Sequence, residues 1–188
     1  TLWQGYGVLI LGFILYLASA YFISDFCLRL SPIPLIVFII YPYLKRFTPL
    51  AHFGVGFGLA MGPLGGWFAV TGSFENFGIA MLLPLFNIFW ATGFDIIYST
   101  LDEHFDKKAN LYSFPSRFGK ENALKISAVL HSIAFVGLLA LFFYSLKALI
   151  AFPFLLLSGF LLWFEQKKSD NVELAFFKIN IVLGFSVL

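Results

Sequence analysis

The amino-acid sequence predicts an all-α integral membrane protein, a multi-helix transmembrane bundle of about seven helices. Its 188 residues are 60% hydrophobic and 20% aromatic, and only 12% are charged. A typical soluble domain carries about 25% charged residues. The charges are also segregated, because long uncharged runs separate short polar stretches. These observations together exclude a soluble globular domain.

Six uncharged runs are candidates for crossing the membrane. In chain order they are residues 1–24, 30–44, 47–74, 76–94, 126–146 and 148–164. Most of them approach or exceed the ~20 residues that cross ~30 Å of hydrocarbon. The shortest run, 30–44, spans the bilayer only if Arg29 and Lys45 extend their charged ends toward the interface.

A seventh apolar segment begins near Leu174, is interrupted by Lys178 and stops at Leu188. That is too few residues for a complete crossing, so we expect a truncation there. At the other end, Thr1 follows no Met, basic region or cleavage site, so no targeting signal is visible. We therefore expect an internal piece of a larger membrane protein.

The distribution of basic residues predicts the orientation of the bundle. Alternating the seven segments across the bilayer leaves only Arg29 and Lys147 on one side. The other side holds Lys45, Arg46, Lys107, Lys108, Arg117, Lys120, Lys125, Lys167 and Lys168. Because basic loops stay in the cytoplasm, we expect a multi-pass protein of the cell's inner (plasma) membrane with its chemistry on the cytoplasmic face.

Three carboxylates follow the fourth long apolar run. If the helix continues beyond this run, a step of about 100° per residue places Asp95, Asp102 and Asp106 within a stripe about 40° wide. Tyr98 lies at its edge. Carboxylates on one stripe repel one another unless cations are bound, and oxygen ligands suit Mg²⁺. The pattern predicts a magnesium site, and the alternative is a solvated, charged helix end.

The longest polar connection covers residues 95–125 and carries these acids. Pro115 and Gly119 interrupt any continuous helix through it. We expect a helical extension to about Lys107, then a turn, and a new helix near Lys120 with Glu121 in its first turn.

A second polar cluster ends the 30–44 run, where Lys45 and Arg46 follow Tyr41, Pro42 and Tyr43. Two adjacent cations can neutralise phosphate oxygens, and arginine can do so with two hydrogen bonds. The alternative is an ordinary basic anchor at the interface. Together with the acidic stripe, the cluster suggests a diphosphate held between basic residues and carboxylate-bound Mg²⁺.

Glycines and histidines within the apolar runs have packing interpretations. Residues 50–72 contain two G-x-x-x-G spacings, at Gly54–Gly58 and Gly58–Gly62, which allow helices to approach closely. The alternative is a bare cavity wall for a long apolar substrate. For His52 and His131 we favour interhelical hydrogen bonds over metal ligation.

The order of three motifs resembles the UbiA superfamily of intramembrane aromatic prenyltransferases, closest to the 4-hydroxybenzoate polyprenyltransferase branch. The first motif is residues 43–48 and the second is residues 63–72. The third is residues 94–106, followed by residues 112–119. A lone D-x-x-x-D motif would be weak evidence for this family. Three motifs in the right order, which cover most of the chain, are strong evidence.

This resemblance implies nine transmembrane helices around a central cavity open to the cytoplasmic side, with 1–188 as part of a single prenyltransferase domain. It also implies two aspartate-rich motifs that bind Mg²⁺ and an isoprenoid diphosphate. Only the second is found, at Asp102 and Asp106. The first, of N-D-x-x-D type, has no match, which fits an N-terminal truncation removing two helices.

The implied reaction is Mg²⁺-dependent transfer of a polyprenyl group to a ring carbon of an aromatic acid such as 4-hydroxybenzoate, in ubiquinone or menaquinone biosynthesis. The partners are the isoprenoid diphosphate, the aromatic acid and membrane lipid, with no nucleic acid. By this resemblance Asp102 and Asp106 bind the metal. Lys45, Arg46 and Arg117 bind the diphosphate, while Asp95 and Tyr98 are catalytic, with Tyr98 orienting Asp95.

Two other classes compete with this interpretation. A cation-coupled transporter also places acids at helix ends and uses glycine-kinked helices, but here the acids gather at one face and not near the midplane. A phosphatidyl-alcohol transferase uses D-x-x-x-D with Mg²⁺ as well, yet its longer signature is not found.

Overall fold

The computed structural model describes residues 2–187, and it confirms the all-α membrane architecture. Within this range the chain forms helices joined by turns, without a β-strand. Six helical stretches are long and apolar enough to cross a bilayer: Leu2–Ile23, Asp25–Leu44, Ala51–Thr71, Phe77–Ser99, Lys120–Leu146 and Leu149–Lys167. Helices are the expected solution, since every backbone N–H and C=O in hydrocarbon must be paired within the chain.

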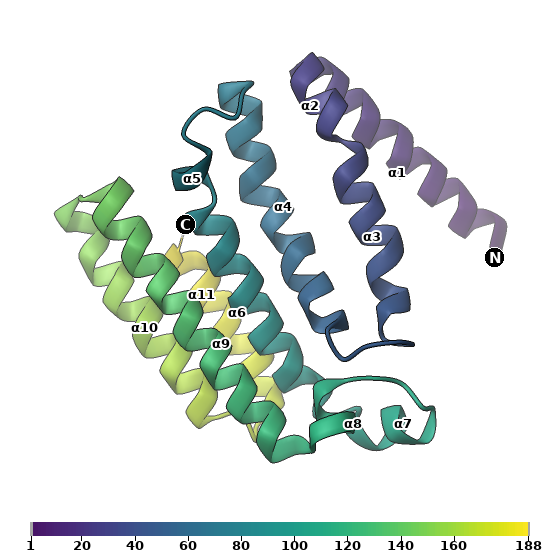
Figure 1. Ribbon diagram of the computed structural model, residues 1–188, viewed down its shortest axis with the longest axis vertical. Coiled ribbons are helices and arrows are strands. Elements are labelled where there is room, and N and C mark those ends of the chain that lie inside the picture. The colour runs from purple at the N-terminus through teal and green to yellow at the C-terminus, as the bar shows by residue number, and fades with distance from the viewer. Residues whose placement is uncertain (1, 188) are drawn as a thin grey trace.

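The first two stretches form a pair at one edge of the molecule (Figure 1). Helix α1 (Leu2–Ile23) is followed by α2 (Asp25–Leu30) and α3 (Pro32–Leu44). The hydroxyl oxygen of Ser24 accepts a hydrogen bond from the Cys27 N–H at 3.1 Å and so caps α2. The short run predicted at 30–44 thereby becomes a longer span, because Arg29 lies inside the helical stretch.

Helix α4 (Ala51–Thr71) packs through its glycines, which confirms the packing interpretation for this end of the helix. A Cβ atom on Gly54 would overlap the Tyr41 side chain of α3. A Cβ on Gly56 would overlap the Ile88 carbonyl of α6. Gly62, in contrast, faces open space. Close approach of backbones is the usual source of helix association where water is absent.

Helix α6 (Leu82–Ser99), preceded by the short α5 (Phe77–Ala80), is the centre of the bundle. It packs against α4 on one side and α9 (Lys120–Leu141) on the other (Figure 1). Its side chains Phe86, Ile96 and Ile97 are fully buried. The residues at its end are therefore held by packing on both flanks.

The predicted helical extension from Asp95 to Lys107 is wrong in detail, because the helix breaks. Helix α6 ends at Ser99, and α7 (Glu103–Lys108) begins after a turn. The Ser99 and Thr100 hydroxyls donate to the carbonyls of Ile96 and Ile97, at 2.8 and 2.7 Å. Such local side-chain bonds compete with the helical backbone pattern.

The rest of the polar connection follows the prediction in part, because a short helix, α8, forms where only a turn was expected. Helix α8 (Phe114–Phe118) has a reciprocal cap, in which Ser113 and Ser116 each accept the other's backbone N–H. Gly119, with φ of 77°, then leads into α9 with Glu121 in the first turn, as predicted. Gly119 adopts a backbone conformation that other residues rarely take.

After α9 the chain reverses its direction twice, first into α10 and then into the seventh segment. The π-helical turn η1 (Phe142–Leu146) and the 3₁₀ turn η2 (Leu149–Ala151) lead into α10 (Phe152–Lys167). The seventh segment is also helical, as η3 (Glu173–Ile179) and α11 (Asn180–Val187). Figure 1 shows α7 and α8 at the same end of the bundle as the α3–α4 turn. The predicted alternation therefore collects the basic and acidic loops at one end, called here the polar end.

Candidate active site at the polar end of the bundle

A small pocket, called here the polar pocket, lies where α3, α4 and α6 meet the α6–α7 turn. Its volume is about 170 Å³. It is lined by Tyr41, Pro42, Lys45, Ala51, His52, Val55, Asp95, Tyr98, Ser99 and Asp102. Four residues predicted to be functional are thus brought together: Asp95 and Tyr98 of α6, Asp102 of the turn after it, and Lys45 at the end of α3.

The carboxylate of Asp95 pairs with a histidine across the α4–α6 interface. His52 Nδ1 lies 2.6 Å from Asp95 Oδ2. The other ring nitrogen, Nε2, lies 3.4 Å from the Phe114 backbone nitrogen, whose N–H donates to it. The His52 side chain is 4% exposed and Asp95 is 23% exposed. The predicted interhelical bond of His52 is therefore confirmed, and its partner is a predicted catalytic residue.

A second ion pair joins the α3–α4 turn to α7. Lys45 Nζ lies 3.0 Å from Asp106 Oδ2. The Asp106 side chain is 1% exposed, and its Oδ1 atom has no hydrogen-bond partner among residues 2–187. Lys45 is 32% exposed and is also one of the residues that line the polar pocket.

The single acidic stripe predicted from helical phase is wrong, since the break after Ser99 removes the shared helix. Asp95 bonds to His52, and Asp106 pairs with Lys45. The described part of the chain has no group of three or more His, Cys, Asp or Glu side chains suited to hold a metal. Asp95 therefore does not form one cluster with the two later acids.

Asp102 and Asp106 still fit a partial magnesium site. They lie one helical turn apart, and the Asp106 N–H donates to the Asp102 carbonyl at 2.8 Å. Asp106 also has a buried carboxylate oxygen without a hydrogen-bond partner among the described residues. Mg²⁺ commonly takes one or two carboxylates and fills its other positions with water and phosphate oxygens. This donor set suits such a shared ion.

Tyr98 lines the polar pocket, but its ring packs against another aromatic ring. The ring centroid lies 4.6 Å from that of Phe176. The described structure contains no hydrogen bond between Tyr98 and Asp95, whose carboxylate bonds to His52 instead. The hydrogen bond from Tyr98 to Asp95 that the prediction requires is therefore not formed, and the partner of the Asp95 carboxylate is His52.

The two predicted arginines lie outside the lining of the polar pocket, and both are exposed. The Arg46 guanidinium lies 5.6 Å from the Tyr43 ring centroid. That of Arg117 lies 3.5 Å from the Tyr112 ring centroid. Cation–π contacts at exposed sites contribute about 0.5–1 kcal/mol, so they leave both cations available for an anion.

The α7–α8 loop is docked onto the α3–α4 turn by contacts that converge on the pocket. The Tyr112 N–H donates to the Lys45 carbonyl at 2.7 Å. The Lys45–Asp106 pair and the Phe114–His52 bond add two more links. The α7–α8 segment is therefore held against two residues that line the polar pocket, Lys45 and His52, and Arg117 of α8 lies in this docked segment.

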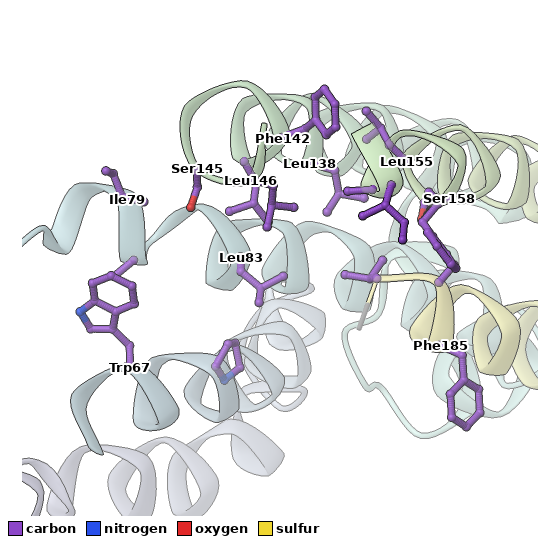
Figure 2. A pocket seen from close by; sticks show the side chains of 18 residues that line it. Trp67, Ile79, Leu83, Leu138, Phe142, Ser145, Leu146, Leu155, Ser158 and Phe185 are labelled. Atoms are coloured by element: carbon purple, nitrogen blue, oxygen red, sulfur yellow. Dashed lines mark hydrogen bonds between the residues drawn. The ribbon is translucent and has the colours of Figure 1, made fainter. Parts of the chain in front are cut away.

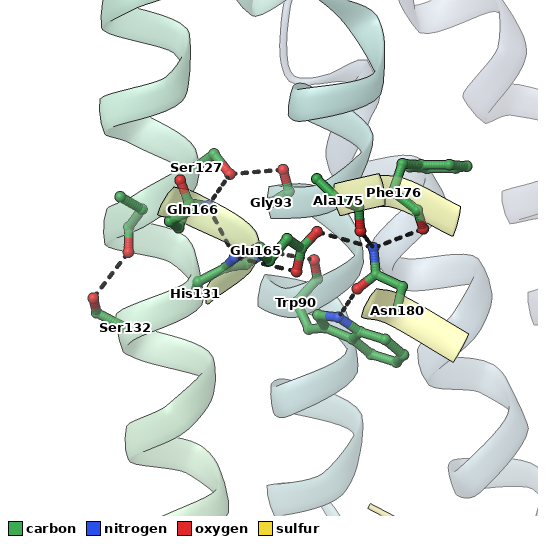
Figure 3. A network of polar contacts seen from close by, with 11 residues as sticks. Trp90, Gly93, Ser127, His131, Ser132, Glu165, Gln166, Ala175, Phe176 and Asn180 are labelled. Carbon is green, nitrogen blue, oxygen red and sulfur yellow. Dashed lines mark hydrogen bonds and ion pairs between the residues drawn. The ribbon is translucent and has the colours of Figure 1, made fainter. Parts of the chain in front are cut away.

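A buried polar network holds α6 a turn before Asp95 (Figure 3). The Ser127 hydroxyl donates to the Gly93 carbonyl at 2.8 Å, and His131 Nε2 lies 3.2 Å from the Trp90 carbonyl. Gln166 Nε2 joins both, at 2.7 Å from Ser127 Oγ and 2.9 Å from His131 Nδ1. The predicted interhelical bonding of His131 is thus confirmed.

A larger, apolar cavity of about 620 Å³ lies toward the other end of the bundle (Figure 2). It is lined by residues that include Trp67, Leu83, Leu138, Phe142 and Leu155. Among its described lining residues none is charged. Its walls suit hydrocarbon and not charge-based chemistry, so the candidate active site is the polar pocket.

Comparison with known proteins identifies the family. Residues 1–182 match the UbiA prenyltransferase family. The chain belongs to this family of transferases. The UbiA assignment confirms the resemblance seen in the motifs, and it favours a transferase over a cation-coupled transporter.

Named relatives support this UbiA assignment. A 4-hydroxybenzoate octaprenyltransferase of Aromatoleum aromaticum is 39% identical over 104 residues, which cover 53% of this chain and 33% of that protein. A mitochondrial 4-hydroxybenzoate polyprenyltransferase of Arabidopsis thaliana is 32% identical over 143 residues, covering 75% and 34%. The chain spans about a third of the length of these curated relatives.

A solved UbiA structure has the same fold. The apo structure of a UbiA homolog from Aeropyrum pernix K1 superposes with a TM-score of 0.86 at 28% identity. The match covers 100% of this chain and 72% of that one. UbiA enzymes are generally Mg²⁺-dependent, in accord with the carboxylates of the polar pocket.

Proposed function

We propose that this protein transfers a polyprenyl group from an isoprenoid diphosphate to a ring carbon of a small aromatic acid such as 4-hydroxybenzoate, in the biosynthesis of ubiquinone or menaquinone. The observation that carries this proposal is the polar pocket, which gathers Lys45, Asp95 and Asp102 at the end of an otherwise apolar bundle. The names of the relatives support the substrate class.

The diphosphate would lie between cations and a metal. Lys45 lines the pocket, and the exposed Arg46 and Arg117 supply further positive charge at the same end. Asp102 and Asp106 would hold Mg²⁺, which neutralises the charge that builds on the diphosphate as it leaves. Fixed charges of this kind stabilise a transition state more than mobile solvent does, because they are already oriented when charge develops.

The proposed reaction releases two products besides the prenylated ring, which are the diphosphate and one proton. The allylic C–O bond breaks, and its electron pair leaves with the diphosphate. The ring carbon then bonds to the allylic carbon, and the ring loses the proton it carried there. Asp95 is the proposed acceptor of this proton, or the charge that stabilises the allylic cation, because its carboxylate is 23% exposed at the polar pocket. Tyr98 forms part of the wall against which the ring would lie.

The chemistry of the proposed substrate explains why such a site would lie within a membrane-spanning bundle. A polyprenyl tail is as insoluble in water as the bilayer core, so it can enter from lipid between apolar helices. We infer that residues 1–188 belong to one transmembrane prenyltransferase domain, with the polar end facing the cytoplasm of the inner (plasma) membrane, because the basic loops gather there.

A direct assay tests the proposal. The full-length protein, purified in detergent, is incubated with geranyl or longer prenyl diphosphates, radiolabelled 4-hydroxybenzoate and Mg²⁺. We expect a prenylated aromatic product that disappears with EDTA and returns with added Mg²⁺. Absence of a product with 4-hydroxybenzoate and with the naphthoate acceptors of menaquinone synthesis would overturn the proposal.

A further inference from the structure

The position and the hydrogen bonds of His52 indicate a role beyond packing. It lies in the first turn of α4, borders the polar pocket and is 4% exposed. Among residues 2–187, its ring is the hydrogen-bond partner of the Asp95 carboxylate, at 2.6 Å. Asp95 Oδ1 is left without such a partner in the same range.

The backbone of α8 determines which nitrogen of His52 carries the proton. The Phe114 N–H is a donor, so His52 Nε2 must accept. A neutral imidazole that accepts at Nε2 carries its proton at Nδ1, and this N–H then donates to Asp95 Oδ2. The tautomer is therefore assigned by the hydrogen bonds on both sides of the ring.

We propose that His52 is the positioning residue for Asp95 in the prenyl transfer reaction, an inference that rests on the proposed function. The Nδ1–H holds one carboxylate oxygen and leaves the other for the aromatic ring or the allylic cation. Because the Phe114 amide engages Nε2, the imidazole cannot pass a proton outward through that nitrogen. Its role is orientation and not proton relay.

The same hydrogen bonds connect the Asp95 carboxylate to the α7–α8 segment that docks on the α3–α4 turn. Phe114 begins α8, and the Tyr112 N–H of the same loop bonds to the Lys45 carbonyl. The Phe114 ring also packs on the imidazole, with ring centroids 5.6 Å apart. Docking of this loop therefore sets the His52 tautomer, and the tautomer sets the orientation of Asp95.

Steady-state kinetics on the full-length protein test the role. His52→Ala should lower kcat about 10- to 100-fold, the loss typical of a misplaced reacting group, with little change in the prenyl diphosphate KM. His52→Asn should recover most of the turnover, since its side-chain N–H lies the same number of bonds from the backbone as Nδ1. The control is His104→Ala, an exposed histidine of α7, which should remain at wild-type turnover.

A double-mutant cycle separates positioning from mere structural support. If His52 acts through Asp95, then His52→Ala should cost nothing further in the Asp95→Asn background. Losses that multiply would overturn the proposal, as would wild-type kcat in His52→Ala. A melting temperature for each variant identifies any that fail to fold. If His52→Ala fails to fold, a folded His52→Asn variant with turnover far below wild type would overturn the proposal.

A measurement without substrate tests the geometry. In ¹⁵N-histidine NMR of the detergent-solubilised protein, the signals lost in His52→Asn assign His52, and we expect a neutral ring protonated at Nδ1. A ring protonated at Nε2 would overturn the assignment even if prenyl transfer is observed. Absence of transfer by the wild-type protein would instead overturn the proposed function, so the two failures are distinguishable.

Discussion

Lys45 and Asp106 form an ion pair of 3.0 Å between the turn that ends α3 and the short helix α7. The carboxylate is 1% exposed, whereas the lysine is 32% exposed. A buried carboxylate with a single cationic partner is costly unless something else shares its charge. In the proposed reaction, Mg²⁺ held by Asp102 and Asp106 would supply this second positive partner, and Asp106 Oδ1 has no hydrogen-bond partner among the described residues.

Asp106→Ala should abolish Mg²⁺-dependent prenyl transfer, and Asp102→Ala should do the same. Each change removes a charged ligand from a site with few others. A loss of one or two orders of magnitude in rate corresponds to about 1.4 to 2.8 kcal/mol of transition-state stabilisation. The measurement is the initial rate across a Mg²⁺ titration, with Asp170→Ala, an exposed acid outside the pocket, as control. Near wild-type turnover in a folded Asp102 or Asp106 variant would contradict the metal assignment.

Lys45→Ala should raise the KM for prenyl diphosphate more than Arg46→Ala does, because Lys45 lines the polar pocket and Arg46 does not. Both should affect the diphosphate more than the aromatic acid. The test compares KM for each substrate in the two variants. A change confined to the aromatic acid would show that the basic pair serves the acceptor instead.

Asp95→Asn should keep diphosphate and Mg²⁺ binding while kcat falls, since the amide preserves the size of the side chain and removes its charge. The measurement pairs isothermal titration with the prenyl diphosphate against turnover. Binding lost in step with turnover would make Asp95 a metal or structural residue. Retained turnover would leave the His52–Asp95 pair as a contact that only stabilises the α4–α6 interface.

Gly56→Ala should destabilise the bundle, because the added methyl would overlap the Ile88 carbonyl and the Thr92 hydroxyl of α6. Forcing extra atoms into a packed interface typically costs about 1–3 kcal/mol. Gly62→Ala in the same helix meets open space and should be neutral or slightly stabilising. Thermal unfolding in detergent compares the two, and equal melting temperatures would contradict the packing role of Gly56.

Gln166→Leu should destabilise the buried network, because it leaves Ser127 Oγ and His131 Nδ1 without their shared donor. An unsatisfied buried polar group costs about 1–3 kcal/mol. Ser132→Ala is the matched control, since its exposed hydroxyl bonds only within its own helix (Figure 3). Unchanged thermal stability in Gln166→Leu would show that the network adds little to the packing of α6 against α9.

Local sequence was enough to predict several features of this protein. Uncharged runs of membrane length determine the helical class, because hydrocarbon admits no unpaired backbone. The asymmetry of lysine and arginine determines which loops share an end of the bundle. The motifs around Lys45 and Asp102 indicated the family, since they depend on short spacings that a single segment carries.

Other features depended on which helix faces meet, and only the tertiary structure decided them. The partner of Asp95 is His52, from another helix, and not the nearby Tyr98. A helix break separates Asp106 from Asp95. At this break the Ser99 and Thr100 hydroxyls bond to nearby backbone carbonyls. Helical phase places residues only within an unbroken helix, and it carries no information about contacts between helices. The pairs that build this site are such contacts, so they follow from the packing of α4, α6 and the α7–α8 loop.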